Sequence, residues 1–196
     1  MDTGQCCSMI VYLHRRLFIF SEDNIMGIII RKAIPQDANN YTVCHISCWQ
    51  SAYKGIVPDE FLKNMSTEKE RRFEKYKNAL ANVGDSKYYC VTYAERMIGF
   101  IIINKSYDED KSSVGEIWAI YLNEEFCGKG YGKEMLDFAI KELKRLKPKE
   151  IFLWVFEENN RARRFYEKFN FSFDGTKREV NYGKPLVQLR YVHNLQ

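Results

Sequence analysis

Three glycines stand close together where an expected strand gives way to an expected helix. They are Gly128, Gly130 and Gly132, in a chain of 196 residues. The first turn of a helix presents free N–H donors and the positive end of its dipole. Glycines leave those donors unshielded, so such a terminus favours a phosphate or pyrophosphate group. The spacing therefore predicts that the main chain binds a phosphorylated cofactor here.

Length and composition suit one globular domain with a buried core. The net charge of +4 is spread along the chain, whereas nucleic-acid binding usually needs clustered basic residues. The basic residues of 141–147 fall in the last turns of an expected helix, where they complement its dipole. We therefore expect no nucleic-acid partner, although a weak attraction to anionic ligands stays open.

The first 26 residues differ from the rest of the chain. The apolar stretch Met9–Phe20 is interrupted by one histidine and two arginines, so it is too short and too charged to span a bilayer. It also lacks the small-residue cleavage site of a secretory signal. A second methionine, Met26, directly precedes a clean strand pattern. We expect residues 1–26 to be an extension from an upstream start codon, or an extra docked strand, with no membrane partner.

The cysteines are irregularly spaced, which indicates reduced thiols in a cytoplasmic protein. They are Cys6, Cys7, Cys44, Cys48, Cys90 and Cys127. Only His45 lies near the Cys44 and Cys48 pair, and no second pair of ligands is in view. The sequence therefore predicts no metal site.

Residues 27–196 read as a single domain in which both helical and extended periods occur. Helices are expected at 35–53, 58–62, 67–80, 131–146 and 159–169. Strands are expected at 27–33, 87–94, 97–105, 114–122, 150–156, 171–177 and 185–192. Short links make the three central strands antiparallel, with a tight turn at Glu95-Arg96. The order predicts an α+β or α/β domain, a mixed sheet with helices on both faces.

Three local details belong to this prediction. Thr67 and Glu70 have the spacing of a capping box for the third helix. The buried side of the first helix is expected to be formed by Val43, Ile46, Cys48, Trp49 and Ala52. The core face of the helix after the glycines is expected to be formed by Met135, Ala139, Leu143 and Leu146.

Two segments match a known family. The first, Cys127-Gly128-Lys129-Gly130-Tyr131-Gly132, is similar to an acyl-CoA loop written Gln/Arg-x-x-Gly-x-Gly/Ala, with cysteine at the first position. The second, residues 159–171, is similar to Asn-x-x-Ala-x-x-Phe-Tyr-Glu-Lys-x-Gly-Phe, with Asn170 in place of glycine. Asparagine is the next-best residue at a left-handed helix cap. The chain thus resembles the Gcn5-related N-acetyltransferases (GNAT) over nearly all of residues 27–193. Trp49–Pro58 also looks like the substrate-side helices of bacterial members.

Other glycine loops fit less well. A dinucleotide-binding fingerprint follows a first parallel strand and needs an acidic residue at the end of the next strand. A Walker loop ends in Gly-Lys-Ser/Thr, which is missing here. Two signatures in the right order, each on its expected element, are much more specific than the glycines alone.

The resemblance implies a mostly antiparallel central sheet of six to seven strands and transfer of an acetyl group from acetyl-CoA to an amine. It implies that Ile120, Tyr121 and Leu122 pair with the pantetheine arm and that Asn159 hydrogen-bonds it. The residues implied around the pyrophosphate are Cys127, Gly128, Lys129, Gly130, Tyr131, Gly132 and Lys133. Simpler roles stay open: a core strand, a helix-entry turn, and an N-cap at Asn159.

An amine with a pKa of about 10 must lose a proton before it attacks. Glu116, two residues before Trp118 on the strand that leads to the cofactor, is the candidate base. A rim carboxylate that attracts a cationic substrate is an equal alternative. A backbone N–H near Ile120 or Tyr121 would stabilise the oxyanion. Tyr166 matches the family's acid for the leaving thiolate, the alternative being a buried aromatic.

The acceptor is an unidentified small-molecule or peptide amine. We expect its pocket to be lined by Trp49, Tyr53 and the Tyr107–Lys111 loop. The alternative is that these residues only pack in the core. Cys127 is expected to be a reactive thiol that bound cofactor protects from alkylation, the alternative being a small filler. The other reading of the whole chain is a non-catalytic acyl-CoA sensor or interaction module. Related proteins are often homodimers, so a homodimer is also open.

Overall fold

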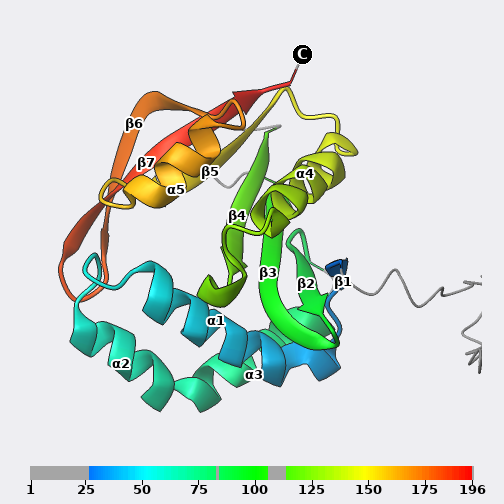
Figure 1. Cartoon of the computed structure of the whole chain (residues 1–196), viewed down its shortest axis with the longest axis vertical. Coiled ribbons are helices and arrows are strands. Elements are labelled where there is room, and N and C mark those ends of the chain that lie inside the picture. The colour runs from blue at the N-terminus through cyan, green and yellow to red at the C-terminus, as the bar shows by residue number, and fades with distance from the viewer. Residues whose placement is uncertain (1–26, 83, 106–113, 196) are drawn as a thin grey trace, which may run out of the picture.

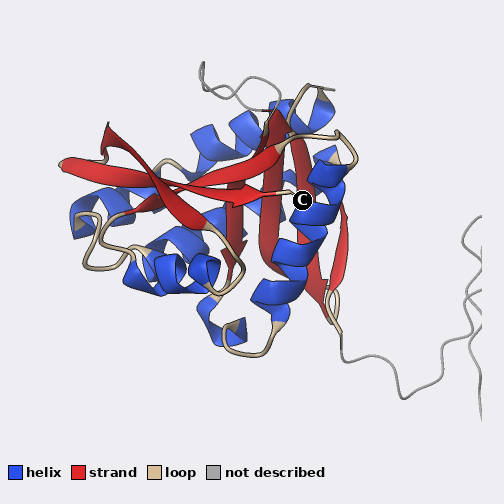
Figure 2. Cartoon of the chain, turned by 90° about the horizontal axis from the view of Figure 1, so that it is seen from above, coloured by secondary structure: helices blue, strands red, loops and turns tan. Residues whose placement is uncertain are grey.

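The computed structural model describes residues 27–82, 84–105 and 114–195. The expected extension 1–26 and the Tyr107–Lys111 loop lie outside these residues. Seven strands form one sheet in the order β1-β2-β3-β4-β5-β7-β6, and Figures 1 and 2 show helices on both of its sides. The strands are β1 Ile29–Lys32, β2 Lys87–Tyr93, β3 Arg96–Lys105, β4 Gly115–Leu122, β5 Glu150–Phe156, β6 Ser172–Asn181 and β7 Pro185–Asn194.

The helices form close to where the sequence predicts them, except that the second, expected at 58–62, extends to Thr67. They are α1 Ala38–Ala52, α2 Asp59–Thr67, α3 Lys69–Ala81, α4 Tyr131–Lys144 and α5 Asn160–Glu167, with single 3-10 turns at Pro35–Asp37 and Glu124–Phe126. Residues of α4 and α5 pack with one face of the sheet, and residues of α1 and α3 pack with the other. The predicted α+β fold with a mixed sheet is therefore confirmed.

Several local expectations were wrong: the position of one turn, the cap of α3 and part of the buried side of α1. The β2–β3 turn is Ala94-Glu95, both at positive φ as in a type I′ hairpin. Thr67 does not cap α3, because its hydroxyl donates to the carbonyl of Asn64 at 2.9 Å and Glu68 takes the N-cap position. In α1, Val43 and Ala52 are exposed, while Tyr41 and Cys44 are buried beside Ile46 and Cys48.

The end of α4 also differs from the expectation. Met135, Ala139 and Leu143 are fully buried, as predicted. Leu146, however, is 41% exposed, because the helix ends at Lys144 and a tight turn follows in which Leu146 N bonds to Leu143 O at 2.9 Å. Within the part of the chain that the structure describes, no helix is both long enough and apolar enough to cross a bilayer.

The sheet opens between β4 and β5. These two strands are parallel and pair at two positions only, Gly115 with Ile151 and Glu116 with Phe152. β3 and β4, by contrast, pair along their length. Beyond Glu116, the β4 edge that faces β5 therefore has no strand beside it, and Figure 1 shows the two groups of strands diverging. This opening places a row of backbone N–H and C=O groups at the centre of the molecule.

Candidate active site

The open edge of β4 contains the three residues that the resemblance assigns to the pantetheine arm. Ile120, Tyr121 and Leu122 are partly buried and pair with β3 on their other side. In an antiparallel ladder, neighbouring residues bond alternately to one side and the other. Part of this segment's backbone therefore points into the opening, where an extended chain with amide groups fits.

The glycine loop leads from β4 into α4. Gly128 and Gly130 have φ values of +80° and +89°, which glycine adopts without strain, and a Cβ at either would meet open space. Gly130 is the N-cap of α4, and the first α-helical hydrogen bond runs from Glu134 N to Gly130 O at 3.3 Å. The N–H groups of 128–132 precede that bond, so they form the cluster of donors that a pyrophosphate needs. The residues present thus fit the expected cofactor.

The other loop side chains turn away from the main-chain donors. Cys127 Sγ lies 3.7 Å from the carbonyl oxygen of Asn123, so it packs back onto the end of β4. Lys133 pairs with Asp137 one turn along α4. Lys129 lies over the ring of Phe126, with Nζ 5.1 Å from its centroid. Backbone groups, rather than these side chains, define the loop, and the reactivity of Cys127 stays a prediction.

Asn159 and Tyr166 lie at the two ends of α5, on the far side of the opening. Asn159 is the N-cap, because its Oδ1 accepts from Ala162 N at 3.1 Å. Its Nδ2 donates to none of the described residues. Tyr166 is buried against Phe165 and Phe171, and its hydroxyl bonds to no residue within the described ranges. Burial raises the pKa of this phenol, with a further increase from nearby Tyr53, so it stays protonated at neutral pH.

A pair of tyrosines joins α1 to β4. Tyr53 and Tyr121 share a hydrogen bond of 2.6 Å between their hydroxyls. Burial raises the pKa of Tyr53 to about 12. Burial also raises the pKa of Tyr121 well above its ordinary value, and the nearby Tyr53 hydroxyl adds to this increase. Both phenols therefore remain protonated at neutral pH, and each can donate or accept a hydrogen bond while it stays uncharged.

A cavity of about 270 Å³ lies beside this pair. It is walled by aromatic rings and a few charged groups from both halves of the sheet and from α1–α3. Its lining residues are His45, Trp49, Tyr53, Phe61, Arg72, Lys75, Tyr76, Phe100, Ile102, Glu116, Trp118, Ala119, Tyr121, Trp154, Phe156, Arg178, Tyr182 and Gln188. Trp49, Tyr53 and Glu116, three residues singled out in the sequence, thus meet in one cavity.

A β-bulge brings Glu116 and Tyr121 to the same cavity. Side chains five positions apart on a regular strand point to opposite faces. Here Ile102 pairs with Ala119 while Ile103 pairs with Ile117, so Trp118 is an extra residue on β4. The extra residue shifts the alternation by one, as bulges near functional sites commonly do. Glu116 is 3% exposed and Tyr121 lies further along the same wall.

Most other cavity residues were missed by the sequence analysis. Arg72 and Lys75 come from α3, and Trp154, Arg178 and Gln188 from the far half of the sheet. Local spacing could not show that these residues share a cavity, because the folded topology brings their elements together. The helical period of α3 does place Arg72, Lys75 and Tyr76 on one face, which was an available signal.

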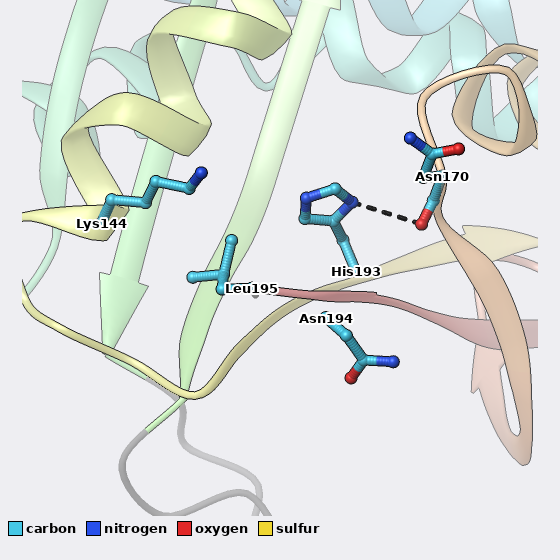
Figure 3. Close-up of a pocket in the computed structure, with 5 residues that line it drawn as sticks. All are labelled: Lys144, Asn170, His193, Asn194 and Leu195. Atoms are coloured by element: carbon cyan, nitrogen blue, oxygen red, sulfur yellow. Dashed lines mark hydrogen bonds between the residues drawn. The ribbon is translucent and has the colours of Figure 1, made fainter.

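A second hollow of about 360 Å³ lies at the other end of the sheet. Lys144, Asn170, His193, Asn194 and Leu195 line it (Figure 3). His193 and Asn194 pair with Ile151 and Glu150, so this hollow lies where β4 and β5 are closed. His193 Nδ1 is 3.2 Å from the backbone oxygen of Asn170. None of the predicted loop, strand or catalytic residues line it.

Comparison with known proteins decides the family. Residues 49–171 match the model of the acetyltransferase (GNAT) family, which is more than half of the chain. The chain belongs to the GNAT acetyltransferase family. This N-acetyltransferase uses acetyl-CoA as the acetyl donor, in agreement with the fit of the glycine loop and the open β4 edge.

Its relatives include enzymes with named acceptors. The chain is 36% identical over 110 residues to the spermine/spermidine N(1)-acetyltransferase of Bacillus subtilis, covering 52% of this chain and 72% of that protein. It is 27% identical over 158 residues to a spermidine N(1)-acetyltransferase of Thermoplasma acidophilum, covering 77% and 92%. The crystal structure of the PaiA N-acetyltransferase of Thermoplasma acidophilum in complex with coenzyme A is similar in fold, with a TM-score of 0.68 and 23% identity over 87% of this chain and all of that one.

Proposed function

We propose that this acetyltransferase transfers an acetyl group directly to the primary amine of a small molecule bound in the aromatic cavity. One observation carries the proposal: Tyr121 belongs both to the open β4 edge and to the cavity wall. The cofactor strand and the acceptor cavity therefore meet at one residue, which is what direct transfer between two bound molecules requires.

The binding residues act through their backbone and their shape. Main-chain N–H groups from Gly128 to Gly132 hold the pyrophosphate, and the β4 edge at 120–122 positions the pantetheine arm. The free Nδ2 of Asn159 donates to the same arm, while its Oδ1 caps α5. Acetyl-CoA supplies the acyl group as a reactive thioester. Trp49 and Tyr53 close the acceptor side and exclude water.

Two side chains handle protons in this proposal. Glu116, buried in the cavity wall, takes a proton from the acceptor ammonium, directly or through water, so that the neutral amine can attack. Tyr166 holds a proton at its hydroxyl, which its raised pKa secures, and donates it to the departing sulfur. A general acid must be protonated before it can donate, and the buried phenol of Tyr166 is protonated at neutral pH.

Thiol release from acetyl-CoA across a panel of amines tests the proposal. We expect acetyl-CoA to bind, NAD and ATP to bind poorly, and at least one primary amine to accelerate thiol release. Cofactor binding without thiol release for any amine would favour the alternative, a non-catalytic acyl-CoA sensor. No binding of coenzyme A would contradict both.

Three further expectations stay predictions. The enzyme is proposed to work in the cytoplasm, to form a homodimer, and to need only residues 27–196 for its fold. Light scattering tests the second, and the activity of a chain that begins at Met26 tests the third.

A further inference from the structure

Buried hydrogen-bond donors without acceptors gather in the cavity. Among the described residues, four buried side-chain atoms lack a hydrogen-bond partner, and three of them belong to cavity residues. These three are N–H donors: Trp49 Nε1, Arg72 Nε and Trp154 Nε1. Native proteins satisfy nearly all buried donors, so each exception needs an explanation. Three in one cavity indicate a ligand rich in acceptor oxygens.

The charge of the cavity points the same way. Its described lining residues include three cations, Arg72, Lys75 and Arg178, and one carboxylate, Glu116. His45 adds no charge, because burial, with help from Arg72 and Lys75, lowers its pKa to about 3. A linear polyamine, which carries only positive charges, would meet three cations and one carboxylate in this cavity and would be repelled. A molecule with one amine and one anionic group would have a counterpart for each end.

Two of the three cations, Arg178 and Arg72, are held in place by contacts with neighbouring side chains. Arg178 lies over the ring of Trp154, with the guanidinium carbon 4.2 Å from the ring centroid, and its Nε bonds to Gln188 at 2.8 Å. Arg72 faces Glu68 at 3.6 Å, and its side chain is only 19% exposed. Arginine and indole N–H groups are directional donors that suit the two oxygens of a carboxylate.

The fourth orphan atom lies outside the cavity lining but next to the cavity residue Glu116. Asn104 Oδ1 is buried without a donor, and Asn104 lies directly opposite Glu116 in the β3–β4 ladder. Cross-strand partners share a face, so an acceptor oxygen and a carboxylate are neighbours there. The amine end of a ligand would be held at Glu116 and its acidic end at the N–H donors.

We propose that the acceptor is an amine that also bears a carboxylate, such as a free amino acid or a short peptide, and that Arg72 with the indoles of Trp49 and Trp154 binds this carboxylate. The proposal rests on the proposed function, since it concerns the same cavity. The volume of about 270 Å³ equals that of about nine water molecules, which suits an acceptor of this size.

Matched acceptors test the proposal. Thiol release by the full-length enzyme is measured with L-phenylalanine against phenethylamine, L-lysine against cadaverine, and with spermidine. Buried donors left unpaired by the wrong substrate give strong discrimination. We expect at least one carboxylate member to exceed its decarboxylated partner at least about tenfold in kcat/KM, and to exceed spermidine as well.

Arg72→Met and its neighbour Arg71→Met form a matched pair of variants. Arg71 is on the same helix, has a side chain 75% exposed, and does not line the cavity. We expect Arg72→Met to lose about tenfold in kcat/KM for the carboxylate acceptor and to change the decarboxylated amine by less than about threefold. Arg71→Met should match the wild type. Trp154→Phe, which keeps a ring but removes one N–H, is the second variant should Arg72→Met unfold.

The outcomes separate this proposal from the proposed function. Equal or better turnover of spermidine or of the decarboxylated amines would overturn the carboxylate proposal and leave N-acetyl transfer intact. Equal losses in Arg72→Met and Arg71→Met would overturn it too. Coenzyme A binding without thiol release for any acceptor would remove the proposed function, and this proposal with it.

Discussion

Burial keeps the phenols around the opening of the sheet protonated. Tyr166 is the one that the proposed reaction uses as an acid, so removing its hydroxyl should affect turnover more than binding. We expect Tyr166→Phe to lower kcat about 100-fold, the low end for general acid catalysis, and to change the KM for acetyl-CoA by less than about threefold. Steady-state thiol release measures both constants.

Tyr89→Phe is the control for this variant. Tyr89 is a buried phenol whose hydroxyl donates to Glu142 at 3.1 Å, and it does not line the cavity. Its loss should lower stability slightly and leave kcat unchanged. Full turnover by Tyr166→Phe would rule out the acid role, whatever the control does.

His45 gives a pH-dependent prediction of stability. Its pKa falls from an ordinary 6.5 to about 3 because it is buried near Arg72 and Lys75. Between pH 6.5 and about pH 3, His45 therefore binds a proton in the unfolded chain but not in the folded chain. Stability from this group is complete above pH 6.5 and is lost as the pH falls toward 3. The free energy of unfolding should drop by about 1.4 kcal/mol at pH 5.5 on this account.

His45→Phe removes the titration while keeping an aromatic ring among Trp49, Tyr76 and Phe100, whose ring centroids lie 5.5–5.6 Å from that of His45. Denaturant unfolding at pH 7.5, 6.5 and 5.5 measures the slope. The variant should lose its hydrogen bond to Tyr76 and be less stable at neutral pH, yet decline less steeply with acid. Parallel slopes for the two proteins would contradict the assignment.

At the scale of single elements, the start of α4 carries the main prediction. Gly130→Ala forces a side chain into a left-handed conformation, which costs about 1–2 kcal/mol, and puts a methyl group beside the N–H donors. We expect the affinity for coenzyme A to fall at least about tenfold, because hydrogen bonds to a charged group are lost. Isothermal titration measures the affinity.

Gly175→Ala is a matched control for that strain. Gly175 on β6 has a φ of +95° and open space where a Cβ would lie, so the conformational cost is similar. It lies outside the loop, and we expect it to bind coenzyme A as the wild type does. If both variants bind normally, the glycine loop does not hold the pyrophosphate.

Elements with a strong hydrophobic period could be predicted from the sequence, and irregular ones could not. β3 and β5 are nearly continuous apolar runs, and α4 shows its buried face at Met135 and Ala139. The bulge at Trp118 was invisible, because one extra residue leaves no trace in composition. β6 was predicted too short, since it is an edge strand whose exposed residues dominate its pattern.

At the scale of the whole molecule, the sequence predicted a loop for the proposed cofactor site but only part of the cavity that we propose for the acceptor. The glycine loop is local, so its spacing alone was enough to predict that it binds a phosphate group. The cavity brings Trp49 of α1, Arg72 of α3 and Trp154 of β5 together. Their proximity depends on long-range packing of three elements, and nothing in the chain between them records it.

We expect the stability of the whole chain to depend on the cofactor, because the junction between β4 and β5 is short. Two ladder positions join the halves of the sheet, and the proposed cofactor site spans the opening beyond them. Coenzyme A at 100 times its dissociation constant should stabilise the folded state by about 2.7 kcal/mol. For a chain of this size, that raises the melting temperature by about 5–10 °C.

Thermal unfolding with and without ligand measures this shift. At the same ligand concentration, coenzyme A should raise the melting temperature of Gly130→Ala much less than that of Gly175→Ala. Because both variants carry a similar conformational strain, the difference measures the contribution of the glycine loop to binding. ATP and NAD should shift the wild type little, because neither has a pantetheine arm to lie along the β4 edge. A shift with ATP as large as that with coenzyme A would mean that phosphates alone account for binding and that the open edge of the sheet plays no part in it.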